Sequence, residues 1–265
     1  MSGILSYFFP EKIDHVLWRP ATIIGLPGSG KTNLSLYLAK LYIEKYRPEN
    51  VNLIYTNNLR EAIFRLNKKP IQVIIVDDAI RYQYSRVSQS DKDLVADYFE
   101  IRHLFEEYRD TGLLAIFFIT QRFNNLDSVF RNTPILFFKT ILMDKRDNDL
   151  IKQYIGEAYF QKLADITKEI YTENKGYNKA IVKSAWGEVY LIDNIPKIKV
   201  FGGLYNNIRR RGNGKIILDL DDITKKIIIM RLKGKRIVKI GEEIGLSKTE
   251  VHRRIQKVIN KILGK

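Results

Sequence analysis

The sequence predicts an α/β fold, with a parallel sheet covered by helices on both faces and a small helical domain after it. Short β-branched runs alternate with stretches of helical periodicity over the first two-thirds of the 265 residues, as in strands joined by crossover helices. The apolar spacing becomes helical again from residue 221 to the end. We therefore expect a sheet domain at 1–194, a linker at 195–220 and a helical domain at 221–265.

The expected strands and helices alternate along the first domain. Strands are predicted at residues 22–25, 51–56, 72–76, 113–120 and 135–139. Helices are predicted at 31–46, 60–66 and 92–108, with two more after residue 147. Residues 181–193 alternate in polarity around Trp186 and Gly187, which predicts a β-hairpin. The helical domain is expected to hold three short helices.

Composition narrows the class of protein. The chain has no cysteine, which excludes disulfides and thiolate metal sites, and no run of 18 apolar residues that could cross a membrane. The N-terminus lacks the basic lead-in of a signal peptide. We therefore expect a cytoplasmic protein with no membrane partner.

A glycine-rich motif follows the first predicted strand. GLPGSGKT at residues 25–32 has the spacing of a P-loop, in which the amides of a tight turn and the start of a helix bind the phosphates of a nucleoside triphosphate. Lys31 is expected to reach the β- and γ-phosphates, and the Thr32 hydroxyl to coordinate Mg²⁺. The predicted cofactors are ATP and Mg²⁺, and the predicted nucleotide ligands are Gly25, Pro27, Gly28, Ser29, Gly30, Lys31, Thr32 and Asn33.

Polar residues close two other predicted strands. VIIVDD at residues 73–78 ends on Asp77, which is predicted to hold Mg²⁺ directly or through water, and on Asp78. Asp78 stands where many P-loop ATPases carry a glutamate that polarises the attacking water. The strand at 113–120 is followed by Gln121, which is expected to orient water or report hydrolysis beside the γ-phosphate. Strand-ending turns are the alternative interpretation of both motifs.

Three motifs in this order resemble the ring-forming, DNA-pumping ATPases named after HerA and FtsK, which include viral packaging and Zot-like members. They are GLPGSGKT, VIIVDD and YRDTGLLAIFFITQR, and they cover about residues 20–140. The resemblance implies a RecA/ASCE-like P-loop ATPase core that assembles into a ring, commonly a hexamer, and moves or remodels duplex DNA. It also implies that an arginine of one subunit completes the site of its neighbour, with Arg109 the first candidate, ahead of Arg122 and Arg131. The chain departs from the family in carrying Asp78 instead of a glutamate.

Positive charge is concentrated in the C-terminal segment. Residues 195–265 hold 19 Lys or Arg and 6 Asp or Glu, which accounts for +13 of the chain's +15. A basic balance confined to one segment predicts a polyanion partner, here DNA; a solvated charged surface is the alternative. Arg209, Arg210 and Arg211 are candidate phosphate contacts, and the Tyr- and Arg-containing segment 81–91 could line the pore of a ring. A plain surface run and a plain loop are the alternatives.

The stretch IGEEIGLSKTEVHRRI at residues 240–255 resembles a helix-turn-helix. Gly245 and Leu246 form the expected turn, and Ser247 is the expected N-cap of the second helix. The apolar residues predicted to pack the two helices are Ile240, Ile244, Leu246, Val251 and Ile255. That packing leaves Lys248, Thr249, His252 and Arg253 facing outward, where they are predicted to contact DNA. A helical oligomerisation tail is the alternative.

The motifs together predict an ATP-hydrolysing, DNA-handling protein encoded by a virus or plasmid, working as an oligomeric motor for translocation, packaging or remodelling. Two alternatives remain open. A DnaA-like initiator or loader would use ATP as a switch and bind one duplex site. A transcription regulator would bind its operator tightly, hydrolyse ATP negligibly and use the nucleotide to set its oligomeric state.

Overall fold

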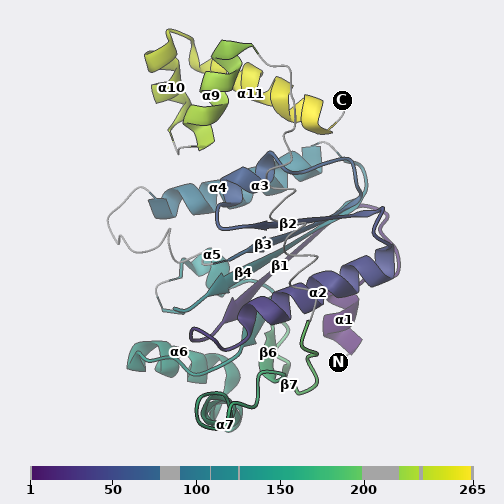
Figure 1. Cartoon of the computed structure of the whole chain (residues 1–265), viewed down its shortest axis with the longest axis vertical. Coiled ribbons are helices and arrows are strands. Elements are labelled where there is room, and N and C mark those ends of the chain that lie inside the picture. The colour runs from purple at the N-terminus through teal and green to yellow at the C-terminus, as the bar shows by residue number, and fades with distance from the viewer. Residues whose placement is uncertain are drawn as a thin grey trace.

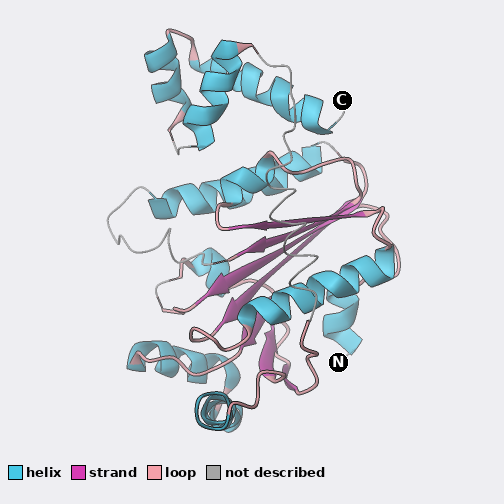
Figure 2. Ribbon diagram, in the orientation of Figure 1, coloured by secondary structure: helices cyan, strands magenta, loops and turns pink. Residues whose placement is uncertain are grey.

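The fold is described by a computed structural model for residues 2–77, 90–107, 109–124, 126–198, 221–232 and 235–263. Its strands are β1 (Val16–Ile24), β2 (Val51–Thr56), β3 (Ile71–Val76), β4 (Gly112–Thr120), β5 (Ile135–Phe138), β6 (Ala180–Ser184) and β7 (Val189–Ile192). They form one sheet in the order β2-β3-β4-β1-β5-β6-β7 (Figures 1 and 2). The first five strands are parallel, whereas β6 and β7 run antiparallel.

Helices cover both faces of this sheet. On one face lie α1 (Ser2–Phe8) and α2 (Lys31–Tyr46), and on the other lie α3 (Leu59–Ile63), α4 (Ser90–Glu107) and α5 (Ser128–Arg131) (Figure 1). Successive strand residues point to opposite faces, so Val73 packs in the cluster of α2 whereas Ile74 packs in the cluster of α3 and α4. Further along the chain, α6 (Lys145–Ile155) and α7 (Glu157–Glu173) extend the second cluster beside β5 and β6.

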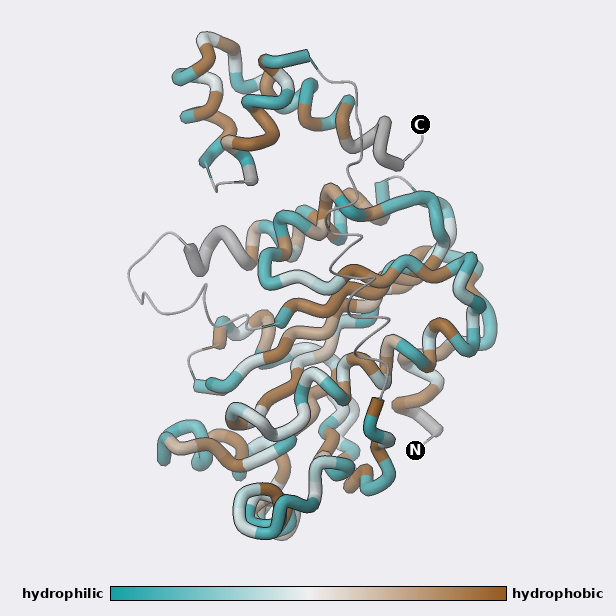
Figure 3. Tube along the Cα trace, in the orientation of Figure 1, coloured by the Kyte–Doolittle hydropathy of each residue, from teal (hydrophilic) through white to brown (hydrophobic). Residues whose placement is uncertain are grey.

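Burial on both faces explains the near-continuous apolar sequence of the central strands. Every residue of β3 and β4 is buried, and Figure 3 shows the central strands largely in brown, the hydrophobic end of the scale. Within the part of the chain that the structure describes, no helix has the combined length and hydropathy that a membrane span requires. The predicted fold class, a P-loop NTPase sheet with helices on both faces and a helical C-terminal region, is confirmed.

The structure differs from the sequence prediction at the N-terminus and in the place of the hairpin. Helix α1 was not predicted, and β1 begins at Val16, six residues before the predicted start. The hairpin of β6 and β7 is present, but it extends the main sheet as an antiparallel edge. In the observed strand order β4 lies between β1 and β3, and the strand that ends before Asp77 is therefore not a direct neighbour of the P-loop strand.

The described residues from 221 onward form three helices, as the periodicity predicts. They are α9 (Asp222–Leu232), α10 (Ile237–Ile244) and α11 (Lys248–Leu263), which we call the helical body. The helical body lies beyond α3 and α4 at one end of the molecule (Figure 1). Among the described residues, two polar contacts join it to the sheet domain: Arg231 Nη2 donates to Glu100 Oε2 at 2.9 Å, and Arg60 Nη1 donates to the Arg231 carbonyl at 3.4 Å.

Candidate nucleotide-binding site

The P-loop, residues 25–32, connects the carboxyl end of β1 to the start of α2. Neighbouring strands hold it from two sides. The Gly25 N–H donates to the Thr120 carbonyl at the end of β4 (3.2 Å), and the Leu26 N–H donates to Thr140 Oγ1, just beyond β5 (2.8 Å). We call this edge of the sheet, where β1, β3, β4 and β5 end, the phosphate edge.

The backbone of the P-loop requires glycine and leaves amides for a ligand. Gly28 and Gly30 have φ values of 74° and 85°, in the left-handed region that favours glycine. A Cβ on Gly28 would meet no atom within 4 Å, so this turn faces open space. Gly30 is the N-cap of α2 and has no side chain to satisfy the first amides of the helix. The buried Ser29 hydroxyl also has no hydrogen-bond partner among the described residues. The loop therefore fits a phosphate group.

Two side chains of α2 reach the positions that a triphosphate site needs. Lys31 is 7% exposed, and its Nζ donates to the Leu26 carbonyl at 2.7 Å, across the loop. Thr32 Oγ1 lies 3.4 Å from Asp77 Oδ2, which brings the P-loop and the end of β3 together across the intervening β4. A hydroxyl and a carboxylate suit Mg²⁺, an ion that binds one or two protein oxygens and completes its shell with water and phosphate. Thr32 and Asp77 could hold it here.

Asp77 has a partner that sequence reasoning missed. The Tyr55 hydroxyl, from the end of β2, donates to Asp77 Oδ2, the oxygen that lies near Thr32. The Asp77 N–H donates to the Thr56 carbonyl at 2.9 Å, which continues the pairing of β2 and β3. The only sequence signal was a tyrosine near the end of the predicted strand 51–56. The predicted catalytic Asp78 and the segment 81–91 lie outside the described residues, apart from the backbone of residues 90 and 91 in α4.

Gln121 lies at the phosphate edge, as predicted. Thr120, the last residue of β4, is in register with Ile24, which directly precedes the P-loop, and Phe118 is in register with Val76. Gln121 thus follows β4 between the P-loop and Asp77, and its side chain is half-buried. Thr120 Oγ1 donates to the Arg122 carbonyl at 2.9 Å and shapes the turn that carries Gln121.

Arg109 lies at the other end of the strands. It precedes β4, whose nine residues span about 30 Å at roughly 3.3 Å per residue. Its guanidinium lies over the Phe105 ring at 5.0 Å and donates to the carbonyls of Asn67 and Lys68. Arg109 therefore cannot reach the P-loop of its own subunit, and a role in nucleotide hydrolysis would have to be in a neighbouring one.

The other two candidate arginines both follow β4 along the chain. Arg122 is at the phosphate edge, but its guanidinium faces Asp144 and Asp147 at 4.0 and 3.8 Å. Arg131 ends α5, and its buried Nε has no hydrogen-bond partner within the described residues.

Asn33 and Pro27, both predicted nucleotide ligands, contact other parts of the chain. Asn33 Nδ2 donates to the Pro196 carbonyl at 3.0 Å, and its Oδ1 accepts the Ile198 N–H at 2.8 Å. The side chain of Asn33 thus holds the segment after β7 against the start of α2. The Pro27 carbonyl accepts the Tyr171 hydroxyl of α7 at 2.5 Å.

A second lysine at the phosphate edge was not predicted. Lys139 follows β5 directly and is fully buried, and its Nζ donates to the carbonyls of Tyr177 (2.7 Å) and Lys179 (2.5 Å). Burial, with the nearby charge of Lys31 as the second cause, lowers the pKa of Lys139 to about 7. The sequence contained one signal, a lysine closing the apolar run ILFFK, but nothing to indicate its partners.

The turn between α10 and α11 has the predicted construction. Gly245 ends α10 with a φ of 74°, and Ser247 Oγ accepts the Glu250 N–H at 3.1 Å, as an N-cap does. A Cβ on Gly241 would lie 2.5 Å from the Leu246 carbonyl oxygen, so the close approach of this turn to α10 requires glycine. Ile240, Val251 and Ile255 are buried, and Ile244 and Leu246 are partly buried against the same cluster.

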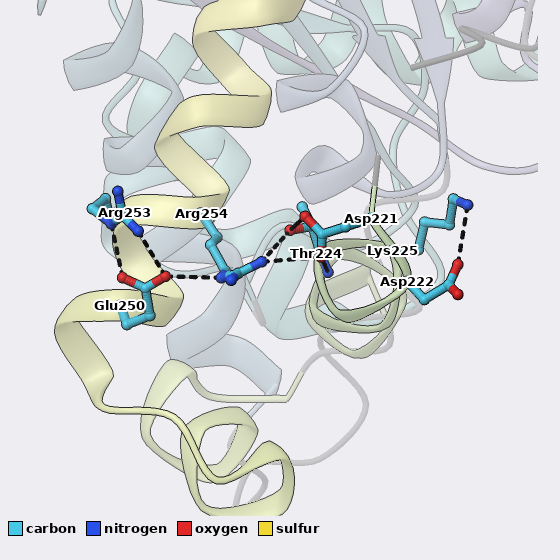
Figure 4. Close-up of polar contacts among 7 residues, drawn as sticks. All are labelled: Asp221, Asp222, Thr224, Lys225, Glu250, Arg253 and Arg254. Carbon is cyan, nitrogen blue, oxygen red and sulfur yellow. Dashed lines mark hydrogen bonds and ion pairs between the residues drawn. The ribbon is translucent and has the colours of Figure 1, made fainter. Parts of the chain in front are cut away.

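The outward face of α11 carries the predicted residues Lys248, Thr249, His252 and Arg253, all exposed. Arg253 is already engaged, since its Nε and Nη2 donate to the Glu250 carboxylate at 2.7 and 2.9 Å (Figure 4). Arg254 bridges Glu250 and Asp221 (Figure 4). The hydrogen bonds from Arg253, and to a smaller extent those from Arg254, lower the pKa of Glu250 to about 2. This carboxylate is therefore ionised at neutral pH.

Comparisons with known proteins give one family match and several structural likenesses. The family model described as Novel STAND NTPase 3 matches residues 19–100, less than half of the chain. No curated protein sequence gives a significant match. The genome packaging NTPase of Sulfolobus turreted icosahedral virus 2 in complex with ATP-gammaS is 12% identical with a TM-score of 0.47, over 67% of this chain and 98% of that chain. A variant of RuvB from Thermotoga maritima is 14% identical with a TM-score of 0.30, over 97% and 82%.

Proposed function

We propose that this chain is an Mg²⁺-dependent ATPase that handles DNA, working as an oligomeric motor for translocation, packaging or remodelling, of the HerA/FtsK type. The observation that carries the ATPase part is the 3.4 Å approach of Thr32 Oγ1 to Asp77 Oδ2 beside a glycine turn that faces open space. The match of residues 19–100 to an NTPase family model supports it, because that range includes both the P-loop and Asp77.

The predicted site residues have distinct roles in this proposal. The amides of the P-loop and the first turn of α2 bind the phosphates, and Lys31 neutralises negative charge at the β- and γ-phosphates. Thr32 and Asp77 hold Mg²⁺, which when bound neutralises charge that develops on the phosphate oxygens. Gln121 orients the attacking water, and Asp78 polarises it. Arg109 completes the site of the neighbouring subunit in a ring, which by family resemblance is a hexamer.

DNA is the proposed partner of the C-terminal part. Residues 195–265 carry +13 of the net charge, and Lys248, Thr249 and His252 are exposed on α11 beside a capped glycine turn. We assign residues 1–194 to the ATPase domain, 195–220 to a linker and 221–265 to a helix-turn-helix domain. Exposed basic side chains on the second helix of such a pair suit contact with a DNA groove.

The same helix pair favours a second candidate function. A helix-turn-helix that reads one duplex site would suit a DnaA-like initiator, or a regulator whose ATP site sets its oligomeric state. These functions use the same nucleotide site but need little turnover.

One experiment separates these functions. ATP turnover is measured with and without duplex DNA of several sequences, and the mass of the protein is measured with nucleotide present. DNA-stimulated turnover without sequence preference, together with a nucleotide-dependent oligomer, is the expected result. Negligible turnover with tight binding to one duplex would favour the initiator or regulator, and failure to bind ATP would contradict all three.

A further inference from the structure

Lys139 is a buried cation that the proposed hydrolysis does not use. It is fully buried next to the P-loop: a Cβ on Gly25 would lie 2.9 Å from Lys139 Cβ, and one on Gly30 would lie 3.9 Å from Lys139 Nζ. The side chain therefore runs beneath the loop from its first glycine toward its last. The backbone N–H of Lys139 also donates to the Ile24 carbonyl at 2.8 Å, which fixes the Lys139 backbone to the end of β1.

The amine of Lys139 links the P-loop to the loop between α7 and β6, residues 174–179. Nζ donates to the Tyr177 and Lys179 carbonyls, and the Tyr177 carbonyl oxygen lies 3.5 Å from where a Gly30 Cβ would be. An ammonium forms stronger bonds to carbonyl oxygens than a neutral amine does, because its donors are charged. The tightness of this link therefore depends on whether Lys139 carries its proton.

The surroundings of the Lys139 amine include a positive charge, and its hydrogen-bond acceptors carry no full negative charge. The positive charge of Lys31, in the P-loop, disfavours the protonated form of Lys139. The Glu169 carboxylate of α7 is bound by another cation, because Lys179 Nζ donates to its two oxygens at 2.9 and 2.7 Å. The Tyr177 and Lys179 contacts to Nζ are made by backbone carbonyls, which supply no full negative charge. A buried cation without a nearby unpaired anion is weakly protonated. A triphosphate in the P-loop would add negative charge close to it.

We propose that Lys139 is a second phosphate-responsive cation of the nucleotide site, which takes up a proton when a triphosphate binds and then clamps residues 174–179 against the P-loop. The proton passes from solvent to the Nζ lone pair, and no bond between heavy atoms changes. Lys139 acts as a positioning residue, because it touches the loop backbone and not the reacting atoms. This inference rests on the proposed nucleotide site and adds its regulation by proton binding.

Calorimetry tests the proposal. A non-hydrolysable ATP analogue with Mg²⁺ is titrated into the full chain at pH 8 in buffers of different ionisation enthalpy. Because burial and Lys31 keep the pKa of Lys139 near 7 without nucleotide, we expect an uptake of about 0.5–0.9 proton per bound nucleotide. Lys139→Met should remove the uptake, whereas Lys175→Met should retain it, because Lys175 lies in the same loop with a side chain that is 75% exposed.

The outcomes separate this inference from the function on which it rests. Wild-type protein that binds the analogue at pH 8 without proton uptake would overturn the role of Lys139 and leave the ATPase proposal standing. Equal uptake in wild type and Lys139→Met would do the same. Wild-type protein that binds no analogue would overturn both. Should Lys139→Met fail to fold, Lys139→Arg serves, since its permanent charge keeps the clamp closed and should also abolish the uptake.

Discussion

The phosphate edge is held together by contacts between residues far apart in sequence, whereas the turn of the helical body is held by contacts between residues close in sequence. At the phosphate edge, Leu26 bonds to Thr140, and Thr32 lies near Asp77, so side chains far apart in sequence converge on one loop. In the turn from α10 to α11, Gly241 packs against the Leu246 carbonyl oxygen, and Ser247 Oγ caps α11 by accepting the Glu250 N–H. These contacts join residues only three to five positions apart. The first region depends on the whole sheet, and the second on its own turn. Substitutions in the two regions should therefore separate nucleotide chemistry from DNA contact.

The largest loss of ATP turnover is expected from the arginine that is proposed to complete the nucleotide site of a neighbouring subunit. Arg109→Ala should lower turnover by about 10³–10⁵-fold if its guanidinium completes a neighbouring site. Asp77→Ala should inactivate the subunit's own site. Mixing the two inactive proteins should restore part of the activity, because some interfaces then pair an intact Arg109 with an intact Asp77. Turnover that stays absent at every mixing ratio would exclude the shared site.

Lys31→Ala should lower ATP turnover by at least about 10²–10³-fold, because the variant loses a preorganised cation at the phosphates. Lys40→Ala is the matched control, since Lys40 lies on the same helix with its side chain 50% exposed and paired to Glu44. Steady-state kinetics and a thermal unfolding curve on both variants check the result. Normal turnover by a folded Lys31→Ala protein would refute the assignment of the P-loop.

Gly241→Ala should destabilise the helical body and leave the nucleotide site unchanged. Its Cβ would lie 2.5 Å from the Leu246 carbonyl oxygen, and such overpacking costs about 1–3 kcal/mol. Hydrogen exchange in α10 and α11 should accelerate and DNA affinity should fall, while ATP affinity stays at the wild-type value. Glu242→Ala, an exposed position on the same helix, is the control. An equal loss of ATP affinity would show that the two regions fold as one unit.

The pH dependence of stability should report Lys139. Its folded-state pKa is lowered to about 7, mainly by burial, so between pH 7 and its ordinary value of 10.5 the unfolded chain binds more protons than the folded one. The contribution of Lys139 to stability is therefore full above pH 10.5 and is lost as the pH falls toward 7. Denaturant titrations of wild type and Lys139→Met should diverge with a slope of up to about 1.4 kcal/mol per pH unit. Parallel curves would contradict the burial of this amine.

The smallest effect concerns two exposed cations of α11. Lys248→Ala should reduce the slope of log K against log salt for duplex DNA binding by about 1, as expected for a lost phosphate contact. Arg253→Ala should change it less, because Arg253 is already bound to Glu250. Equal changes would indicate that DNA displaces Glu250 from Arg253.

The range of the contacts also explains what sequence reasoning could find. The bounds of β2 and α2 were predicted to the residue, and the N-cap at Ser247 was predicted because each motif is contained in one short segment. Nothing local indicated that Tyr55 would donate to Asp77, or that Lys139 would reach Tyr177, 38 residues along the chain. Asn33 matched the motif, yet its side chain holds Pro196 and Ile198 because the fold brings that distant segment to α2.

The central claim is that the P-loop binds a triphosphate whose magnesium ion is held by Thr32 and Asp77. The most direct test is the affinity for a non-hydrolysable ATP analogue, with and without Mg²⁺, in wild type and in Asp77→Asn. We predict that Mg²⁺ strengthens binding to wild type and that this gain is lost in Asp77→Asn, while binding without Mg²⁺ is similar in the two proteins. An equal gain in both, or no binding to wild type, would contradict the account.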